Sequence, residues 1–232
     1  MFYAPNISSE QVLPEEESQH AVRVLRLQAG DNIEIVDGVG GFYKAVITNP
    51  HPKHCSFEVV EKEENFGKRD YKLHIAIAPT KNIERYEWFI EKCVEIGIDE
   101  ITPLQCRFSE RKIIKPERLE KIIVSAAKQS IKAYFPKLNP MCSFNDFIKL
   151  QHVAQKFIAH CYPGDKKLLQ CVYEKSSDVI ILIGPEGDFS SEEVQKALQS
   201  NYQPISLGSS RLRTETAGVV ACHTVVMLNE LR

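Results

Sequence analysis

The stretch DVIILIGPEGDF, which runs from Asp178 to Phe189, decides the fold of this chain of 232 residues. Residues 179–183 are all apolar, and a loop that contains Gly184 and Gly187 follows at once. A short, continuous apolar run that ends in a turn is typical of a strand buried on both faces, as the strands of parallel sheets are. We therefore expect residues 178–183 to form a buried strand.

Strands and helices alternate on both sides of this stretch, which is the pattern of a parallel sheet covered by helices. Asn82 is positioned to cap one helix, Pro116 to begin another, and Ser190 with Glu193 to form a capping box for a third. The first of these helices carries an apolar stripe that includes Trp88, which we expect to face the core. The sequence predicts strands at 72–78, 100–104, 157–161, 178–183 and 204–207, and helices at 82–96, 116–131, 143–150, 190–200 and 214–231.

The first 70 residues have the composition of a β structure. Short alternating runs are separated by Asp-Gly and Gly-Gly pairs, and this spacing of strands and turns indicates a small β-barrel. Residues 61–70 are polar and lack periodicity, so we expect a linker there. The sequence thus predicts two domains, 1–70 and 71–232, with strands at 33–36, 42–48 and 56–60 in the first.

The net charge is small but unevenly distributed. The 29 Lys and Arg against 31 Asp and Glu give −2, which by itself argues against a polyanionic partner. Residues 1–70 carry 7 basic and 12 acidic side chains (−5), which leaves 22 and 19 (+3) for residues 71–232. Residues 107–137 alone carry 9 basic and 3 acidic ones (+6), which suits either a solvated helix face or a nucleic-acid footprint.

Composition also excludes several classes of protein. The hydrophobic share of 43% is too high for a disordered chain, and neither collagen-like nor coiled-coil repeats are present. No apolar run approaches the ~18 residues of a membrane span, and the N-terminus lacks the features of a signal peptide, so we expect a cytoplasmic protein. The seven cysteines and seven histidines have no metal-ligand spacing, and we predict no metal and no disulfide framework.

Two glycine-bearing loops, at 183–189 and 207–216, each connect a predicted strand to a predicted helix. Ligands of open α/β sheets bind beyond the carboxyl ends of the strands, where both loops lie. Neither loop matches a dinucleotide or P-loop motif, and Glu186 and Asp188 bring negative charge that disfavours phosphate. A ligand that joins an adenine to a cationic centre tolerates this charge better, and S-adenosylmethionine has that chemistry.

The second loop leads into a polar helix start. Thr214 is positioned to cap this helix and Glu215 to complement its dipole, but Arg213 has no structural task there. A permanently charged, planar guanidinium suits an anion that is bound or develops during a reaction. Lys81 and Arg85 follow the 72–78 strand at the same edge of the sheet, where phosphate contact and surface pairing are equally open.

Four segments carry a resemblance to a known family. They read HAVRVLR at 20–26, RYEW at 85–88 with EK and EIG soon after, LIGPEG at 182–187, and LG at 207–208 with LRTETA at 212–217. Together they resemble the small-subunit ribosomal RNA (uracil-N3)-methyltransferases, a family of the SPOUT methyltransferases. The resemblance implies a PUA-like N-terminal β-barrel and a C-terminal α/β domain whose trefoil knot holds S-adenosylmethionine. It also implies a homodimer.

The resemblance further implies roles for individual residues. Arg213 would orient the uracil or stabilise its developing anion, and Glu215 is the candidate proton acceptor; the sequence does not choose between them. The chain departs from the family pattern at Asp188, Ser210 and Lys132. The implied cofactor contacts are Leu182, Gly184, Glu186, Gly187, Leu207, Gly208, Leu212, Arg213, Thr216 and Ala217, and the implied RNA contacts are Arg23, Arg26, Lys81, Arg85, Arg111, Lys112, Lys128 and Lys132.

The expected function is therefore methylation of N3 of one uridine in small-subunit ribosomal RNA, within the assembled subunit. Two alternatives stay open. A SPOUT enzyme of this kind can act on another base or on a ribose hydroxyl, and the same fold can serve as a non-catalytic RNA-binding factor in ribosome assembly.

Overall fold

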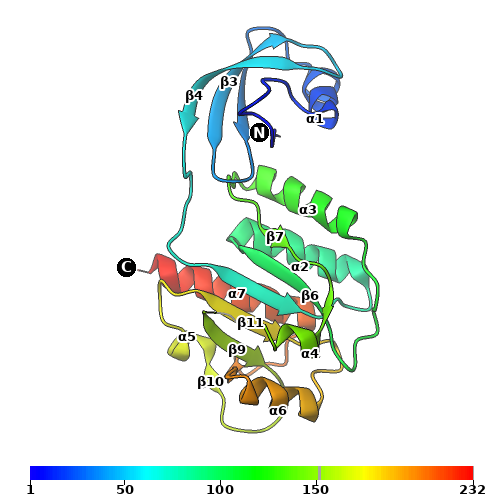
Figure 1. The fold of residues 1–232 in the computed structure, drawn as a ribbon, viewed down its shortest axis with the longest axis vertical. Coiled ribbons are helices and arrows are strands. Elements are labelled where there is room, and N and C mark those ends of the chain that lie inside the picture. Colours follow the sequence, from blue (N-terminus) through cyan, green and yellow to red (C-terminus); the bar gives the residue numbers. More distant parts are fainter. Residues whose placement is uncertain (151–152, 232) are drawn as a thin grey trace. The chain divides into compact units, whose positions relative to one another are not determined.

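The computed structural model describes residues 1–150 and 153–231 (Figure 1). The chain forms two compact units, one of residues 1–68 with 124–135 and one of residues 69–123 with 136–232. The junction after Lys68 lies within the predicted linker, but the sequence assigns residues 124–135 to the other domain. They join the first unit because Ala133 and Phe135 pack with Val36 and Phe42.

The first unit is built on a four-stranded sheet in the order β1-β2-β3-β4. Strand β1 pairs with β2 in parallel, whereas β2 with β3 and β3 with β4 are antiparallel. The structure adds a short α-helix and a π-helical turn that the sequence did not predict, because neither has a helical apolar period. The elements are β1 (Phe2–Tyr3), α1 (Glu15–Gln19), η1 (His20–Val24), β2 (Asn32–Val36), β3 (Phe42–Asn49) and β4 (Ser56–Glu63).

The second unit contains a parallel sheet in the order β10-β12-β9-β11-β5-β6-β7, with β8 paired to β6 (Figure 1). Strand β11 lies between β5 and β9, and all five of its residues are buried. This confirms the buried strand that the sequence predicts. The strands are β5 (Leu73–Ile77), β6 (Glu100–Gln105), β7 (Lys137–Leu138), β8 (Cys142–Ser143), β9 (Gln155–Ala159), β10 (Lys167–Leu168), β11 (Val179–Ile183) and β12 (Gln203–Ser206).

Helices cover both faces of this sheet. On one face, α2 and α7 pack so closely that a Cβ atom on Gly218 of α7 would lie 2.5 Å from the Phe89 ring and 3.0 Å from Ile77 of β5. On the other face, α4 and α6 pack on side chains of β11 and β5 that include Leu182 and Ala76. The helices are α2 (Ile83–Ile96), α3 (Pro116–Gln129), α4 (Phe144–Phe147), α5 (Leu169–Val172), α6 (Ser191–Gln199) and α7 (Thr214–Glu230).

Local capping confirms most of the predicted helix starts. The Asn82 carboxamide oxygen accepts a hydrogen bond from the Glu84 N–H at 3.1 Å, and Ser190 and Glu193 form the predicted capping box. The prediction for Trp88 is wrong: its side chain is 43% exposed, because the buried stripe of α2 is centred on Phe89 and its helical neighbours instead. Among the described residues, no helix has the length and apolarity needed to cross a membrane.

Candidate active site

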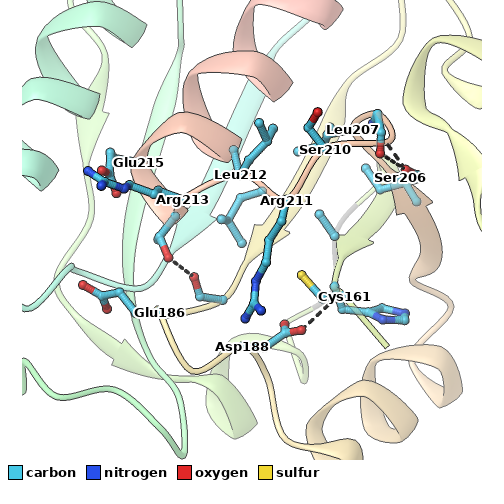
Figure 2. Close-up of a pocket in the computed structure, with 18 of the residues that line it drawn as sticks. Cys161, Glu186, Asp188, Ser206, Leu207, Ser210, Arg211, Leu212, Arg213 and Glu215 are labelled. Atoms are coloured by element: carbon cyan, nitrogen blue, oxygen red, sulfur yellow. Dashed lines mark hydrogen bonds between the residues drawn. The ribbon is translucent and has the colours of Figure 1, made fainter. Parts of the chain in front are cut away.

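A cavity of about 760 Å³ lies beyond the carboxyl ends of β9, β11 and β12 in the second unit (Figure 2). Its walls are the loops that follow these three strands, and the first turn of α7 closes one side. Because the three strands are neighbours in a parallel sheet, loops distant in sequence meet at one edge. This is where the sequence predicts a ligand site.

One hydrogen bond joins the two glycine-bearing loops. The Thr214 hydroxyl donates to the Gly184 carbonyl oxygen at 3.0 Å, and Thr214 is buried. The prediction that Thr214 caps α7 is therefore wrong: Arg213 has the N-cap position, without a side-chain capping bond, and the threonine hydroxyl fixes the 183–189 loop to the helix instead.

The two carboxylates of the first loop are held by backbone N–H groups of neighbouring loops. Glu186 Oε1 accepts from the Lys81 N–H at 2.8 Å. Asp188 Oδ2 accepts from the Cys161 N–H at 2.7 Å, and its Oδ1 from the Phe189 N–H at 2.8 Å. Asp188 has a φ of 64°, the left-handed region in which glycine is favoured and aspartate is tolerated. Asp188 can thus adopt this backbone conformation and connect two loops.

Arg111 supports the loop that follows β5. Its Nε donates to the Thr80 carbonyl oxygen at 3.0 Å and its Nη2 to the Lys81 carbonyl oxygen at 2.6 Å. Lys81 also forms an exposed ion pair with Glu110 at 2.8 Å. Because the Lys81 N–H holds the Glu186 carboxylate, Arg111 supports the 183–189 loop indirectly, through the loop that follows β5.

A second cavity, of about 600 Å³, lies beside α2, and we call it the α2 recess. It shares a wall with the first cavity, because five residues line both: Arg85, Arg211, Leu212, Arg213 and Glu215. Figure 2 shows Arg213 and Glu215 at this wall, at the start of α7. Ligands in the two cavities would therefore meet there.

Glu215 is the buried acid of this shared wall. Its carboxylate is 8% exposed, and its Oε1 lies 3.9 Å from Arg85 Nε. Its Oε2 is buried and has no hydrogen-bond partner among the described residues. A buried carboxylate oxygen without a donor is costly, so this atom indicates a ligand that brings one.

His160 lines the first cavity from the loop that follows β9. Burial, together with the nearby Lys166 ammonium, lowers the pKa of His160 below its ordinary value. Lys166 Nζ is fixed there by the His160 and Tyr162 carbonyl oxygens, both at 2.7 Å. The imidazole is therefore neutral near pH 7, and its buried Nδ1 has no partner in the part of the chain that is described.

The structure brings most of the predicted cofactor residues together. Leu182 is not among the lining residues, because its side chain points to the face covered by α4 and α6. Gly187 faces Phe108, whose Cβ lies 3.1 Å from where a glycine Cβ would be, and Thr216 lines the α2 recess only. The catalytic candidate Glu215 also lines the first cavity. The predicted cofactor contacts that line it are Gly184, Glu186, Leu207, Gly208, Leu212, Arg213 and Ala217.

The predicted RNA contacts are distributed over both units. Arg23 and Arg26 are exposed in the first unit, where Arg26 has a φ of 57°. Lys128 pairs with the nearly buried Glu17 at 2.5 Å, so part of its charge is already used within the unit, and Lys132 follows the end of α3. In the second unit the residues near the sheet edge are Lys81, Arg85, Arg111 and Lys112.

Sequence reasoning missed several residues of the site. Arg211 extends into the first cavity in Figure 2, and Cys161 lies there because β9 is the neighbour of β11. The strand order that brings Cys161 to the site cannot be read from local patterns. Trp88, the single tryptophan of the chain, lines the α2 recess, and a correct register of the helical stripe would have found it.

Comparisons with known proteins identify the family. Residues 68–226 match the model of the RNA methyltransferase domain, and residues 13–60 match the RNA methyltransferase PUA domain. The ribosomal RNA small subunit methyltransferase E of Buchnera aphidicola is 32% identical over 216 residues, which is 90% of this chain and 84% of that protein.

Two solved structures are similar over nearly the whole chain. The probable rRNA-methyltransferase of Porphyromonas gingivalis has a TM-score of 0.93 at 45% identity and covers 99% of this chain and 98% of its own. The ribosomal RNA small subunit methyltransferase E of Neisseria gonorrhoeae, solved with S-adenosyl methionine bound, has a TM-score of 0.85 at 27% identity, with 98% and 96% covered. The family model spans more than half of the chain, and this protein belongs to the RNA methyltransferase family.

Proposed function

We propose that this protein methylates N3 of a uridine in small-subunit ribosomal RNA with S-adenosylmethionine as methyl donor. The chain belongs to the RNA methyltransferase family, and its relatives with 90% coverage are named as small-subunit ribosomal RNA enzymes. The single observation that carries the choice of base is the buried, unpartnered Oε2 of Glu215 at the wall shared by the two cavities.

The donor pattern of uracil suits this carboxylate. Uracil carries a hydrogen on N3 between two carbonyl oxygens, whereas N3 of cytosine carries none. Glu215 would accept the N3 hydrogen, and Arg85, whose Nε lies 3.9 Å from its Oε1, can donate to a neighbouring carbonyl oxygen. A pocket that leaves a buried carboxylate unpaired discriminates against a base that lacks the donor.

Glu215 and Arg213 divide the chemistry in this proposal. Glu215 accepts the N3 proton as the new N–C bond forms, and the proton later passes to water. The Arg213 guanidinium, which lines both cavities, stabilises the negative charge that spreads to the carbonyl oxygens of the base. When bound, S-adenosylmethionine supplies a methyl group on a positively charged sulfur, which becomes a neutral thioether after transfer.

The first cavity fits this donor. Its volume of about 760 Å³ is within the ~300–1,000 Å³ of small-molecule sites. The carboxylates of Glu186 and Asp188 suit its ammonium and sulfonium groups, and Arg211 suits its carboxylate. A Cβ on Gly208 would meet no atom within 4 Å, which leaves the backbone there open to a flat adenine. The cofactor contacts we propose are Gly184, Glu186, Leu207, Gly208, Leu212, Arg213 and Ala217.

Recognition of RNA, in our proposal, uses the PUA-like unit together with the basic residues of the catalytic unit. Exposed Arg23 and Arg26 are available for phosphate contact in a unit whose charge is otherwise acidic. Because residues 1–70 carry a net charge of −5, affinity for naked RNA would be low. We therefore propose the assembled small subunit as the substrate and a cytoplasmic role in ribosome biogenesis.

We also infer a homodimer. Helix α7 keeps apolar side chains on its outward face two turns apart, because Val220 is half-buried and Met227 is 37% exposed; Leu231, directly after the helix, is 55% exposed. A second copy of the chain would cover this stripe.

A trefoil knot is part of the same proposal. The last strand, β12, pairs with β9, whereas α7 packs on α2 and β5, so residues 207–213 must cross the carboxyl ends of the strands between them. The Thr214 hydroxyl, which donates to the Gly184 carbonyl oxygen, would hold this crossing segment in place.

The test is methyl transfer from labelled S-adenosylmethionine to small subunits, naked ribosomal RNA and an unrelated transcript, followed by mass spectrometry of the nucleosides. We expect N3-methyluridine in small subunits only. Glu215→Gln and Arg213→Ala should each lower kcat by about 100-fold or more while calorimetry still detects cofactor binding. Glu230→Gln, at the far end of the same helix, is the matched control. Methylation of a ribose or of another base would refute the choice of N3, and no methylation of any RNA would refute the enzyme.

A further inference from the structure

The α2 recess contains a tryptophan that the core does not use. Trp88 is 43% exposed, although Phe89 beside it is fully buried. Tryptophan is highly buried on average, so an indole left at the surface indicates a binding role more often than a surface leucine does. It is also the only tryptophan in the chain.

The other lining residues of the recess decide what kind of ligand it suits. Asn82, Glu84, Arg85, Arg211 and Arg213 are exposed and polar, and they surround the indole together with buried Glu215. One aromatic face within a ring of hydrogen-bonding and cationic groups is typical of a nucleobase site, in which stacking holds the ring and polar groups read its edge.

The position of the recess limits which base it can hold. It shares the Arg213 and Glu215 wall with the cavity that we assign to the methyl donor. Methyl transfer requires the methyl group of the donor to touch the acceptor atom of the base, so the two ligands must meet where the cavities adjoin. A base in the recess is therefore the reacting base, and a neighbouring base would be too far from the donor.

We propose that the α2 recess receives the target base after it has left its stack, and that the Trp88 indole stacks on one of its faces. This inference rests on the proposed function and adds to it the residue that holds the base. Positions 85 and 88 are one helical turn apart on α2, so Arg85 reaches the base edge while Trp88 covers the ring.

Kinetics with small subunits give the first test. Trp88→Ala should lower kcat/KM for the RNA by about 5- to 100-fold, the range expected when one base–aromatic stack is lost, with calorimetric S-adenosylmethionine binding unchanged. Trp88→Phe keeps an aromatic face and should stay within about three-fold of wild type. Lys92→Ala, one turn further along α2 and outside the recess, is the matched control.

The fluorescence of the single tryptophan gives a second test that does not need turnover. Uridine 5′-monophosphate, added to the protein with S-adenosylhomocysteine, should quench the Trp88 emission, and ribose 5-phosphate should not. No quenching by millimolar nucleotide, or an equal loss of activity in Trp88→Ala and Trp88→Phe, would overturn the proposal. So would a change of oligomeric state in Trp88→Ala measured by light scattering, because Trp88 would then contact a second copy. If wild type quenches but methylates no RNA, the proposed function fails and the base site stands.

Discussion

Replacing Gly218 by alanine tests the packing that positions helix α7. Gly218 lies on α7 one turn after Glu215, and a Cβ there would be 2.5 Å and 2.6 Å from two ring carbons of Phe89 and 3.0 Å from Ile77 Cδ1. All three residues are buried, so the clash cannot be relieved toward solvent. Either the Phe89 ring or the α7 helix must move.

Two opposing effects set the size of the change. Overpacking a well-filled core costs about 1–3 kcal/mol. Alanine in place of glycine within a helix returns about 1 kcal/mol of helix propensity. The added Cβ would lie less than 3.0 Å from a rigid ring, so we take the upper part of the overpacking range. We therefore expect a net loss of about 1–2 kcal/mol in the free energy of unfolding.

The assay is urea unfolding followed by the emission of Trp88, which lies on α2 beside Phe89 and therefore reports on the second unit. The double variant Gly218→Ala with Phe89→Leu should be more stable than the two single effects predict, by about 1 kcal/mol, because leucine removes the ring that clashes. His223→Ala, at an exposed position of α7, is the control for helix propensity. A Gly218→Ala variant as stable as wild type or more so, with no coupling to Phe89, would refute the close approach of α2 and α7.

Three further predictions follow from single residues. Ile131 has a φ of 57°, which strains a β-branched residue, and it is 50% exposed. Ile131→Gly should therefore raise the free energy of unfolding by about 0.5–1 kcal/mol in urea titration, and a lower value would contradict this strain. The pKa of His160 is lowered in the folded state, so protonation favours the unfolded chain. Stability should therefore fall as the pH drops below about 6.5, and His160→Gln should flatten that fall in thermal melts at pH 5–8. Asp188→Ala should cost about 1 kcal/mol in chemical denaturation, because it removes two hydrogen bonds to the carboxylate and places alanine at a left-handed position. Asp188→Asn should cost less than half of that, and equal costs would contradict this reasoning.

Local sequence patterns predicted the longer elements of the second unit, but not the short β7, β8, β10 and α5. The apolar run at 179–183, the Ser190 capping box and Pro116 at a helix start are all confirmed, because each depends on residues within one turn or strand. The π-helical turn at His20–Val24 was missed because it has no apolar period. The trefoil knot was expected only from the family resemblance, since no local pattern encodes a crossing of the chain.

The candidate site was predictable only where one segment carries it. The motifs at 182–187 and 212–217 contain Gly184, Arg213 and Glu215, so motif reading found them. Sequence reasoning did not find Arg211 and Cys161, because their positions in the cavity depend on strand order and loop conformation. Thr214 was assigned to a cap because a threonine at a helix start usually has that role, whereas here its hydroxyl bonds to a loop 30 residues away.

The position of β11 between β5 and β9 has a consequence for synthesis of the protein. Strand β5 ends at Ile77, but its partner on that side begins only at Val179, about a hundred residues later in translation. Until then β5 and β9 lack the strand that lies between them, and pairing across such a separation is slow. A product truncated before Val179 would leave the edges of β5 and β9 open as templates for aggregation. The yield of folded protein should thus depend on the time that passes between synthesis of β5 and synthesis of β11.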